Sequence, residues 1–193
     1  ARPCGFAVGQ MCGLTGAFTR RAGRDLPSTI ANMASTLEHR GPDDVGIWCD
    51  PEVGVGLGFR RLAILDLSPT GHQPMASADG RYQMVFNGEI YNFRELRSDL
   101  ESGGARFRGT SDTEVILACL QRYGIADTLA RLNGMFAIAI WDAPSRQLHL
   151  ARDPIGIKPM FVHAAEGWVT FGSELKALRA APVFSRELSP TAL

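Results

Sequence analysis

The chain has 193 residues, 45% of them hydrophobic, and this length and composition fit one globular domain and exclude a disordered or fibrous protein. Twenty basic residues balance twenty acidic ones, so the net charge directs the chain neither to nucleic acid nor to a membrane surface. No apolar run approaches the ~20 residues of a membrane-spanning helix, and the four cysteines lack the spacing of zinc ligands or of a disulfide framework. We therefore expect a cytoplasmic protein that holds no metal and binds a small molecule or another protein.

Short β-branched or aromatic runs bounded by glycine predict strands, and helical spacing of apolar residues predicts helices. In chain order we expect a strand at 13–19, a helix at 28–37, strands at 45–48, 53–59, 61–66 and 82–86, helices at 92–101 and 112–123, and strands at 135–141, 147–151, 160–163 and 168–172. Brief turns between several strands are typical of antiparallel hairpins. Ser28, Asn92 and Ser173 are candidate N-caps. The pattern indicates an α+β fold with two sheet faces and a few covering helices.

Cys12 is the first candidate catalytic residue. If Met11 is removed, the freed α-amine, with an unperturbed pKa of ~7.7 to 8.0, lies a few bonds from the thiol and can relay its proton. Residues 1–10 precede Met11, and while they remain attached the Cys12 nitrogen is an amide with no useful basicity. We expect either that Met11 is the true start or that a leader is cleaved, and we favour the first. A buried cysteine in a first strand is the alternative interpretation.

Three later segments contain further candidates, each with an alternative. Asn87 and Gly88 follow a predicted strand, where an amide and a backbone N–H can hold a developing oxyanion, but a hairpin turn is favoured on these residues alone. Arg61 begins the strand predicted at 61–66 and is suited to bidentate capture of a carboxylate; a solvated arginine is the alternative. Asp112 begins a predicted helix and either meets a substrate ammonium or caps the helix, and capping is favoured without further context.

Eight sequence blocks resemble, in order and spacing, the glutaminase domain of glutamine-hydrolysing asparagine synthetases. The likeness runs from Cys12 to about Leu178, nearly the whole chain. The blocks are Met11-Cys12-Gly13-Leu14, His39-Arg40-Gly41-Pro42-Asp43, Arg61-Leu62-Ala63-Ile64-Leu65-Asp66, Asn87-Gly88-Glu89-Ile90-Tyr91-Asn92, Ser111-Asp112-Thr113-Glu114, Leu132-Asn133-Gly134-Met135-Phe136-Ala137, Arg152-Asp153-Pro154-Ile155-Gly156-Ile157-Lys158-Pro159 and Gly172-Ser173-Glu174-Leu175-Lys176-Ala177-Leu178.

The resemblance implies a class II glutamine amidotransferase domain, an αββα four-layer sandwich of two antiparallel sheets and of the amino-terminal nucleophile (Ntn) hydrolase type. Such a domain hydrolyses glutamine to glutamate and ammonia and needs no cofactor of its own. Cys12 matches the nucleophile, with its own α-amine as general base. Asn87 and the backbone of Gly88 match the oxyanion hole.

The resemblance also implies how glutamine is bound. Arg61 matches the residue that binds the α-carboxylate, while Glu89 and Asp112 match the groups that hold the α-ammonium. This division agrees with the chemistry, because the zwitterionic end of glutamine needs opposite charges at a fixed separation.

The same resemblance divides the chain into a leader or mis-assigned segment at 1–10, the amidotransferase domain at 11–180, and the start of a linker to a C-terminal synthetase domain at 181–193. In the family, ammonia passes through a tunnel to that domain, where ATP and Mg activate aspartate for asparagine synthesis. Glutamine and the synthetase domain are therefore the expected partners, with a homodimer as the expected assembly. The alternatives are an asparagine-synthetase-like amidotransferase with a different acceptor and a non-catalytic scaffold of the same fold.

Overall fold

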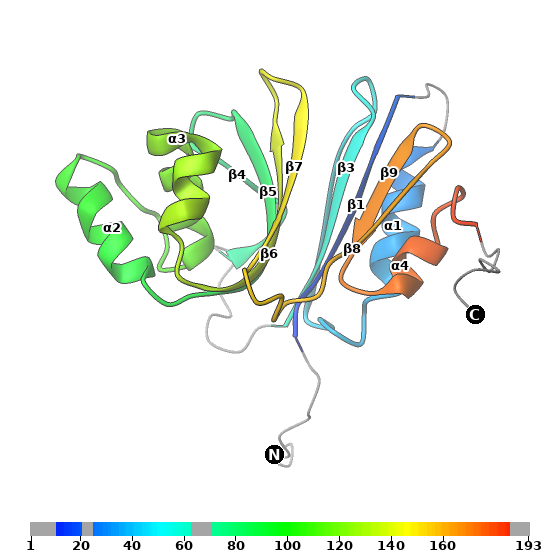
Figure 1. Cartoon of the computed structure of the whole chain (residues 1–193), viewed down its shortest axis with the longest axis horizontal. Coiled ribbons are helices and arrows are strands. Elements are labelled where there is room, and N and C mark those ends of the chain that lie inside the picture. The colour runs from blue at the N-terminus through cyan, green and yellow to red at the C-terminus, as the bar shows by residue number, and fades with distance from the viewer. Residues whose placement is uncertain (1–10, 21–24, 63–70, 186–193) are drawn as a thin grey trace, which may run out of the picture.

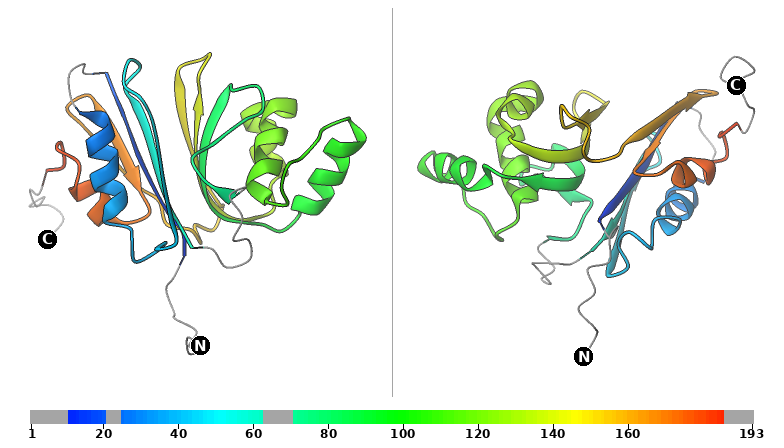
Figure 2. Two further views of the ribbon diagram at one scale, coloured as in Figure 1. Left: turned by 180° about the vertical axis from the view of Figure 1, so that it is seen from behind. Right: turned by 60° about the horizontal axis from the view of Figure 1, so that its bottom comes forward.

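The computed structural model describes residues 11–20, 25–62 and 71–185. Two antiparallel sheets pack face to face, and helices cover the outer face of each sheet, which gives four layers (Figure 1). Figure 2 shows the same layers from behind and from below, with the helices on the two outer sides in both views. The expected α+β class and αββα layer order are confirmed.

The first sheet has five antiparallel strands in the order β2-β3-β1-β9-β8. Two helices, α1 (Leu26–Ser35) and α4 (Leu175–Arg179), cover its outer face. Ile30 and Met33 of α1 are fully buried there against Ala17 and Trp168 of the sheet. The strands are β1 (Gly13–Thr19), β2 (Asp44–Asp50), β3 (Val55–Arg61), β8 (Phe161–Ala165) and β9 (Trp168–Gly172).

The second sheet has four antiparallel strands in the order β4-β5-β6-β7. Its outer face is covered by α2 (Phe93–Ser102) and α3 (Asp112–Arg131), and α3 is broken at Gly124, whose φ of 77° and ψ of 177° are not helical. The break follows directly on the predicted helix end at residue 123. The strands are β4 (Met75–Ala76), β5 (Tyr82–Ile90), β6 (Gly134–Asp142) and β7 (Gln147–Arg152).

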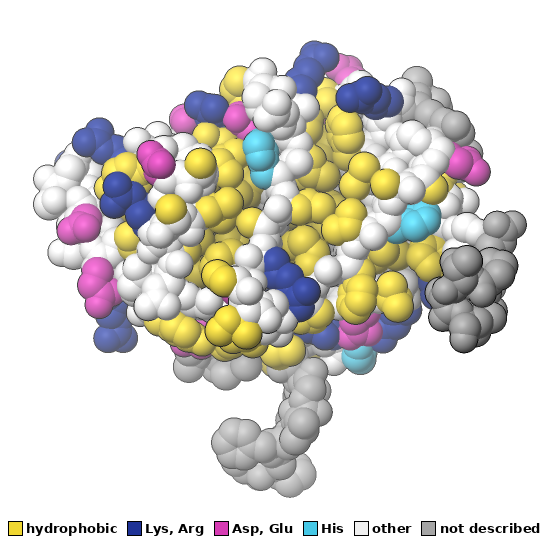
Figure 3. Space-filling model, viewed as in Figure 1, with side chains coloured by type: hydrophobic (Ala, Val, Ile, Leu, Met, Phe, Trp, Pro, Cys, Tyr) yellow, Lys and Arg dark blue, Asp and Glu magenta, His cyan; other side chains and the backbone are white. Residues whose placement is uncertain are grey.

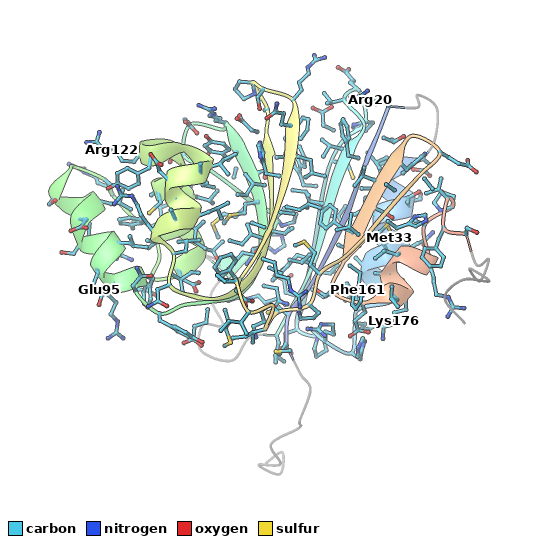
Figure 4. The ribbon with its side chains drawn as sticks, viewed as in Figure 1. Arg20, Met33, Glu95, Arg122, Phe161 and Lys176 are labelled. Atoms are coloured by element: carbon cyan, nitrogen blue, oxygen red, sulfur yellow. The ribbon has the colours of Figure 1, made fainter. Side chains whose placement is uncertain are left out.

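Side chains from both sheets fill the space between them (Figure 4). Because side chains alternate along a strand, one face of β5 and β6 packs on the helices and the other packs on the first sheet. This inner core consists of Leu14, Leu57, Phe59, Val85, Ala137, Ala139 and Phe171, with Cys12 packed against it. Within the described residues, no helix has the length and apolar character to cross a membrane.

Several local predictions are wrong. Arg61 ends β3 instead of beginning a new strand, and residues 63–66 of that predicted strand lie outside the described residues. Asn87 and Gly88 lie inside β5, which continues to Ile90, so they form no hairpin turn. The two-residue strand β4 was not expected.

The predicted helix caps are also corrected. Asp25, not Ser28, caps α1, because its carboxylate accepts a hydrogen bond from the Ser28 backbone N–H at 3.1 Å. Asn92 occupies the N-cap position of α2, but its side chain instead bonds the backbone of Arg131 and Asn133. Ser173 is fully buried, and its hydroxyl accepts the backbone N–H of Leu14 at 3.0 Å, so it secures β1 instead of capping a helix.

Candidate active site

The predicted site residues come from separate elements and meet at one end of the sandwich, the lower edge in Figure 1. Cys12 directly precedes β1 and Arg61 ends β3. The antiparallel register pairs Gly13 with Arg60, which places Cys12 beside Arg61. β5 ends at the same edge and contacts both β1 and β3. The backbone topology therefore assembles the site from segments far apart in sequence.

The Cys12 thiol is half-buried and held against the backbone of Leu62. The Leu62 N–H donates to Sγ at 3.4 Å, and Sγ lies 3.8 Å from the Leu62 carbonyl oxygen. Burial raises the pKa of the Cys12 thiol above its ordinary value, although this N–H and the charges of Arg61 and Lys158 act in the opposite direction. The thiol is thus protonated at neutral pH and needs a base to become a nucleophile.

Asn87 presents a buried amide with an unused donor. Its side chain is 2% exposed and lies on the inner face of β5, the face that also bears Val85. Among the described residues, Asn87 Nδ2 has no hydrogen-bond partner. An unsatisfied buried donor costs about 1 to 3 kcal/mol, so this amide is suited to a ligand acceptor.

Gly88 is required by the close approach of β6. A Cβ at this position would lie 2.2 Å from the Met135 carbonyl oxygen and 2.8 Å from Phe136 Cα. Alternation along β5 directs the Gly88 N–H to the same edge as the N–H groups of Phe86 and Ile90. Those two neighbours are bonded by side chains, from Phe86 N to Gln73 Oε1 at 2.6 Å and from Ile90 N to Asp112 Oδ2 at 3.1 Å.

Asp112 connects the start of α3 to the end of β5. Ser111 caps α3, accepting the Glu114 N–H at 3.3 Å, so the interpretation of Asp112 as the cap is wrong. Burial raises the pKa of Asp112, and the like charge of Glu89 adds to the rise, despite the hydrogen bond from Ile90. A cation placed between these two carboxylates would relieve that cost.

Two cations, Arg61 and Lys158, act on the thiol, and two carboxylates, Asp112 and Glu89, lie near the end of β5. Arg61 is half-buried, and its guanidinium packs so closely on Gly71 that a Cβ there would lie 2.5 Å from Nη2. Glu89 is exposed, and its charge acts on both Asp112 and Lys158. The site thus offers a cation on the β3 side and carboxylates on the β5 side.

Three residues contribute to the site without having been assigned a role from sequence. Arg40 is 6% exposed, and its Nε donates to the Cys12 carbonyl oxygen at 3.1 Å while Nη1 donates to Glu174 at 3.1 Å. Lys158 places its ammonium 2.9 Å from Met11 Sδ. Gln73 is buried and also donates to the Phe86 carbonyl oxygen at 3.1 Å. Arg40 and Lys158 lie in blocks of the family resemblance, which was the available signal.

Two surface cavities, of about 300 and 460 Å³, lie at the opposite end of β1 from Cys12 and share Phe18, Arg20 and Val169 in their linings. Neither contains any of the predicted site residues. In the described part of the chain, no three His, Cys, Asp or Glu side chains are grouped to hold a metal ion.

Comparison with known proteins gives a consistent result. The family described as "Glutamine amidotransferase domain" matches residues 11–193. Asparagine synthetase [glutamine-hydrolyzing] 1 of Bacillus subtilis is 42% identical, covering 89% of this chain and 27% of its own length. A putative asparagine synthetase [glutamine-hydrolyzing] of Mycobacterium tuberculosis is 43% identical over 87% of this chain and 28% of its own. The chain therefore spans about a quarter of these relatives.

The fold also matches a solved structure. Glutamine phosphoribosylpyrophosphate amidotransferase of B. subtilis superposes with a TM-score of 0.75 at 23% identity, covering 93% of this chain and 46% of its own. At that identity the likeness establishes the fold and leaves the chemistry to the site residues.

Proposed function

Since the chain belongs to the glutamine amidotransferase family, we propose that Cys12, once it is amino-terminal, hydrolyses glutamine to glutamate and ammonia. The observation that carries the proposal is a half-buried thiol packed against the inner core, with the buried and unpartnered amide of Asn87 on the inner face of β5.

The proposed reaction has two halves. The α-amine of Cys12 accepts the thiol proton, and the thiolate attacks the side-chain carbonyl carbon of glutamine. Asn87 Nδ2 and the Gly88 N–H stabilise the oxyanion of the tetrahedral intermediate. The protonated amine then gives its proton to the leaving nitrogen, which departs as ammonia and leaves a thioester. Water, deprotonated by the same amine, attacks the thioester and releases glutamate and the thiol.

The charges at this end of the sandwich support glutamine as the substrate. We assign the α-carboxylate to the Arg61 guanidinium, whose planar fork matches a carboxylate. We assign the α-ammonium to Asp112 and Glu89, whose mutual repulsion a cation relieves. This arrangement requires both a carboxylate and an ammonium in the substrate, so a simple amide lacking them would be a poor substrate.

The direct test is ammonia release from glutamine by protein processed to begin at Cys12. We expect turnover by this form and none by Cys12→Ala. The same chain with Met11 still attached is the matched control and should be inactive, because its nitrogen is an amide. A folded, processed protein that releases no ammonia would contradict the proposal and favour a non-catalytic scaffold.

We further propose that residues 11–180 form the glutaminase domain of an asparagine synthetase, with 1–10 as a leader or mis-assigned segment and 181–193 as the start of a linker. The names of the relatives and the quarter of their length that the chain spans support this assignment. ATP and Mg would then serve the synthetase part of the protein, which converts aspartate to asparagine with the ammonia supplied here.

An exposed apolar surface near the site supports a partner domain. Ile155, in the loop that leads to Lys158, is 85% exposed, and Ile157 and Tyr91 are also exposed. Figure 3 shows hydrophobic side chains gathered along this lower edge of the molecule. Such a surface is typical of a protein interface.

The acceptor is tested with the full-length gene product. Cys12→Ala should abolish glutamine-dependent asparagine synthesis but leave synthesis from free ammonia intact. Loss of both activities would contradict the division of labour. Ammonia-dependent amidation of a carboxylate other than aspartate would favour the alternative of a different acceptor.

A further inference from the structure

Lys158 is a buried cation that the proposed mechanism does not use. Its side chain is 6% exposed, and Nζ lies 2.9 Å from Met11 Sδ. A thioether is only a weak acceptor, so this contact compensates little of the cost of burying an ammonium. Burial lowers the pKa of Lys158, and the nearby positive charge of Arg40 adds to the effect. A buried cation with so weak a partner needs an explanation.

The loop that contains Lys158 is bonded to the start of β6. Asp153 is buried, and its carboxylate accepts the backbone N–H groups of Phe136 at 3.2 Å, Ile157 at 2.8 Å and Lys158 at 3.0 Å. Arg152 Nε donates to the Lys158 carbonyl oxygen at 2.6 Å. Phe136 pairs with Gly88 in the sheet, so the same strand end supports Lys158 and the proposed oxyanion hole.

The position of Lys158 relative to Cys12 gives it a role. Lys158 contacts the Met11 side chain, and its charge acts on the Cys12 thiol. The backbone nitrogen of Cys12, which forms the peptide bond to Met11, lies between these two side chains along the chain. When Met11 is removed, the thioether is lost and that nitrogen becomes an amine. Two amines then share one partly buried site.

We infer that Lys158 is a positioning residue whose ammonium keeps the α-amine of Cys12 unprotonated at neutral pH, which rests on the function proposed above. Two like charges at short range disfavour each other, so one amine gives up its proton at a lower pH. An α-amine has an ordinary pKa of ~7.7 to 8.0 and a lysine ~10.4, so the α-amine is the one that becomes neutral. Neutral α-amine is the form that can take the thiol proton.

The other charges around this site do not cancel the effect. Arg40 and Arg61 have the same sign as Lys158 and act in the same direction, although Glu174 pairs with Arg40 and offsets part of its charge. Asp153 is already bonded to three backbone N–H groups, and Glu89 is exposed, so solvent screens its charge. When glutamine is bound as proposed, its ammonium pairs with Glu89 and neutralises it further.

The first test is the pH dependence of kcat/KM for glutamine hydrolysis by protein that begins at Cys12. Lys158→Met removes the charge with little change in shape, and the acid limb should move up by about one pH unit. Lys158→Arg keeps the charge and should keep the limb in place. Arg122→Met removes an exposed charge on α3 (Figure 4) and serves as the matched control. An unmoved limb in an active Lys158→Met enzyme overturns the inference.

A second measurement does not depend on turnover. In the Cys12→Ala form, the α-amine of residue 12 can be titrated by ¹⁵N NMR. With Lys158 present, its pKa should lie below the ordinary ~7.7 to 8.0, and Lys158→Met should raise it by about one unit. A pKa at or above the ordinary range with Lys158 present overturns the inference, whether or not the variant folds. Absence of glutamine hydrolysis by the unsubstituted protein would instead contradict the proposed function.

Discussion

Asp142 and Asn87 are buried polar residues at opposite ends of the sandwich, and they differ in how their polar groups are paired. At the end away from Cys12, Asp142 is 4% exposed and forms a bidentate pair with Arg81, with distances of 3.0 and 2.9 Å. At the Cys12 end, two buried nitrogens, Arg40 Nη2 and Asn87 Nδ2, have no partner among the described residues. Paired buried groups stabilise the folded chain, whereas unpaired ones cost stability and are available to a ligand.

This difference predicts that substitutions of Asn87 and Asp142 have opposite consequences. Substitution of Asn87 should lower activity and leave the free energy of unfolding nearly unchanged. Substitution of Asp142 should lower the free energy of unfolding and leave activity unchanged. Active sites commonly contain buried polar groups that lower the stability of the folded protein but are needed for activity.

The largest expected effect is that of Asn87→Ala. Loss of one oxyanion donor should lower kcat for glutamine by about 10² to 10³ with little change in KM. Because Nδ2 makes no hydrogen bond to lose, the free energy of unfolding should change by less than about 1 kcal/mol. Steady-state kinetics and urea denaturation measure the two quantities. A raised KM with normal kcat would instead place Asn87 in substrate binding.

Arg61→Lys should have a smaller effect. The lysine keeps the charge but loses the planar fork, so one hydrogen bond to the α-carboxylate is lost and KM for glutamine should rise about tenfold. Glutamine with its α-carboxylate amidated is the matched probe, since it should bind the unsubstituted protein and the variant about equally. If glutamine affinity is unchanged in the variant, Arg61 does not contact the substrate.

Much of the fold could be predicted from local patterns. The strand predicted at 13–19 coincides with β1, because apolar and β-branched residues bounded by glycine specify a buried strand wherever the chain places it. The predicted N-cap at Ser28 lies about one helical turn too late, because Asp25, three residues earlier, has a side-chain oxygen that accepts the same kind of backbone hydrogen bond. Such signals are local and depend little on the rest of the chain.

The site itself depends on contacts that local patterns do not contain. Asn87 and Gly88 favoured a hairpin turn, and only the approach of Met135 and Phe136 from β6 explains why glycine is needed within a strand. Ser173 looked like a helix cap, yet its hydroxyl bonds Leu14, which is 159 residues away. The resemblance to a family supplied the site residues because it compares whole arrangements; their roles remain predictions for the experiments above.

The smallest expected effect lies at the opposite end of the sandwich. Asp142→Asn keeps the shape of the side chain but removes its charge, so the free energy of unfolding at pH 7 should fall. We expect a decrease of only about 1 kcal/mol, because Arg81 is half exposed and solvent screens its charge. The hydrogen bonds from Arg81 lower the pKa of Asp142 in the folded protein. The stabilisation by this pair is therefore complete above the unfolded-state pKa of about 3.9, and it is lost as the pH falls through the lower folded-state pKa. The difference between the two proteins should therefore shrink below about pH 4, while glutamine turnover at pH 7 stays the same. A loss of turnover equal to that of Asn87→Ala would show that the two ends are coupled and that the contrast between them is wrong.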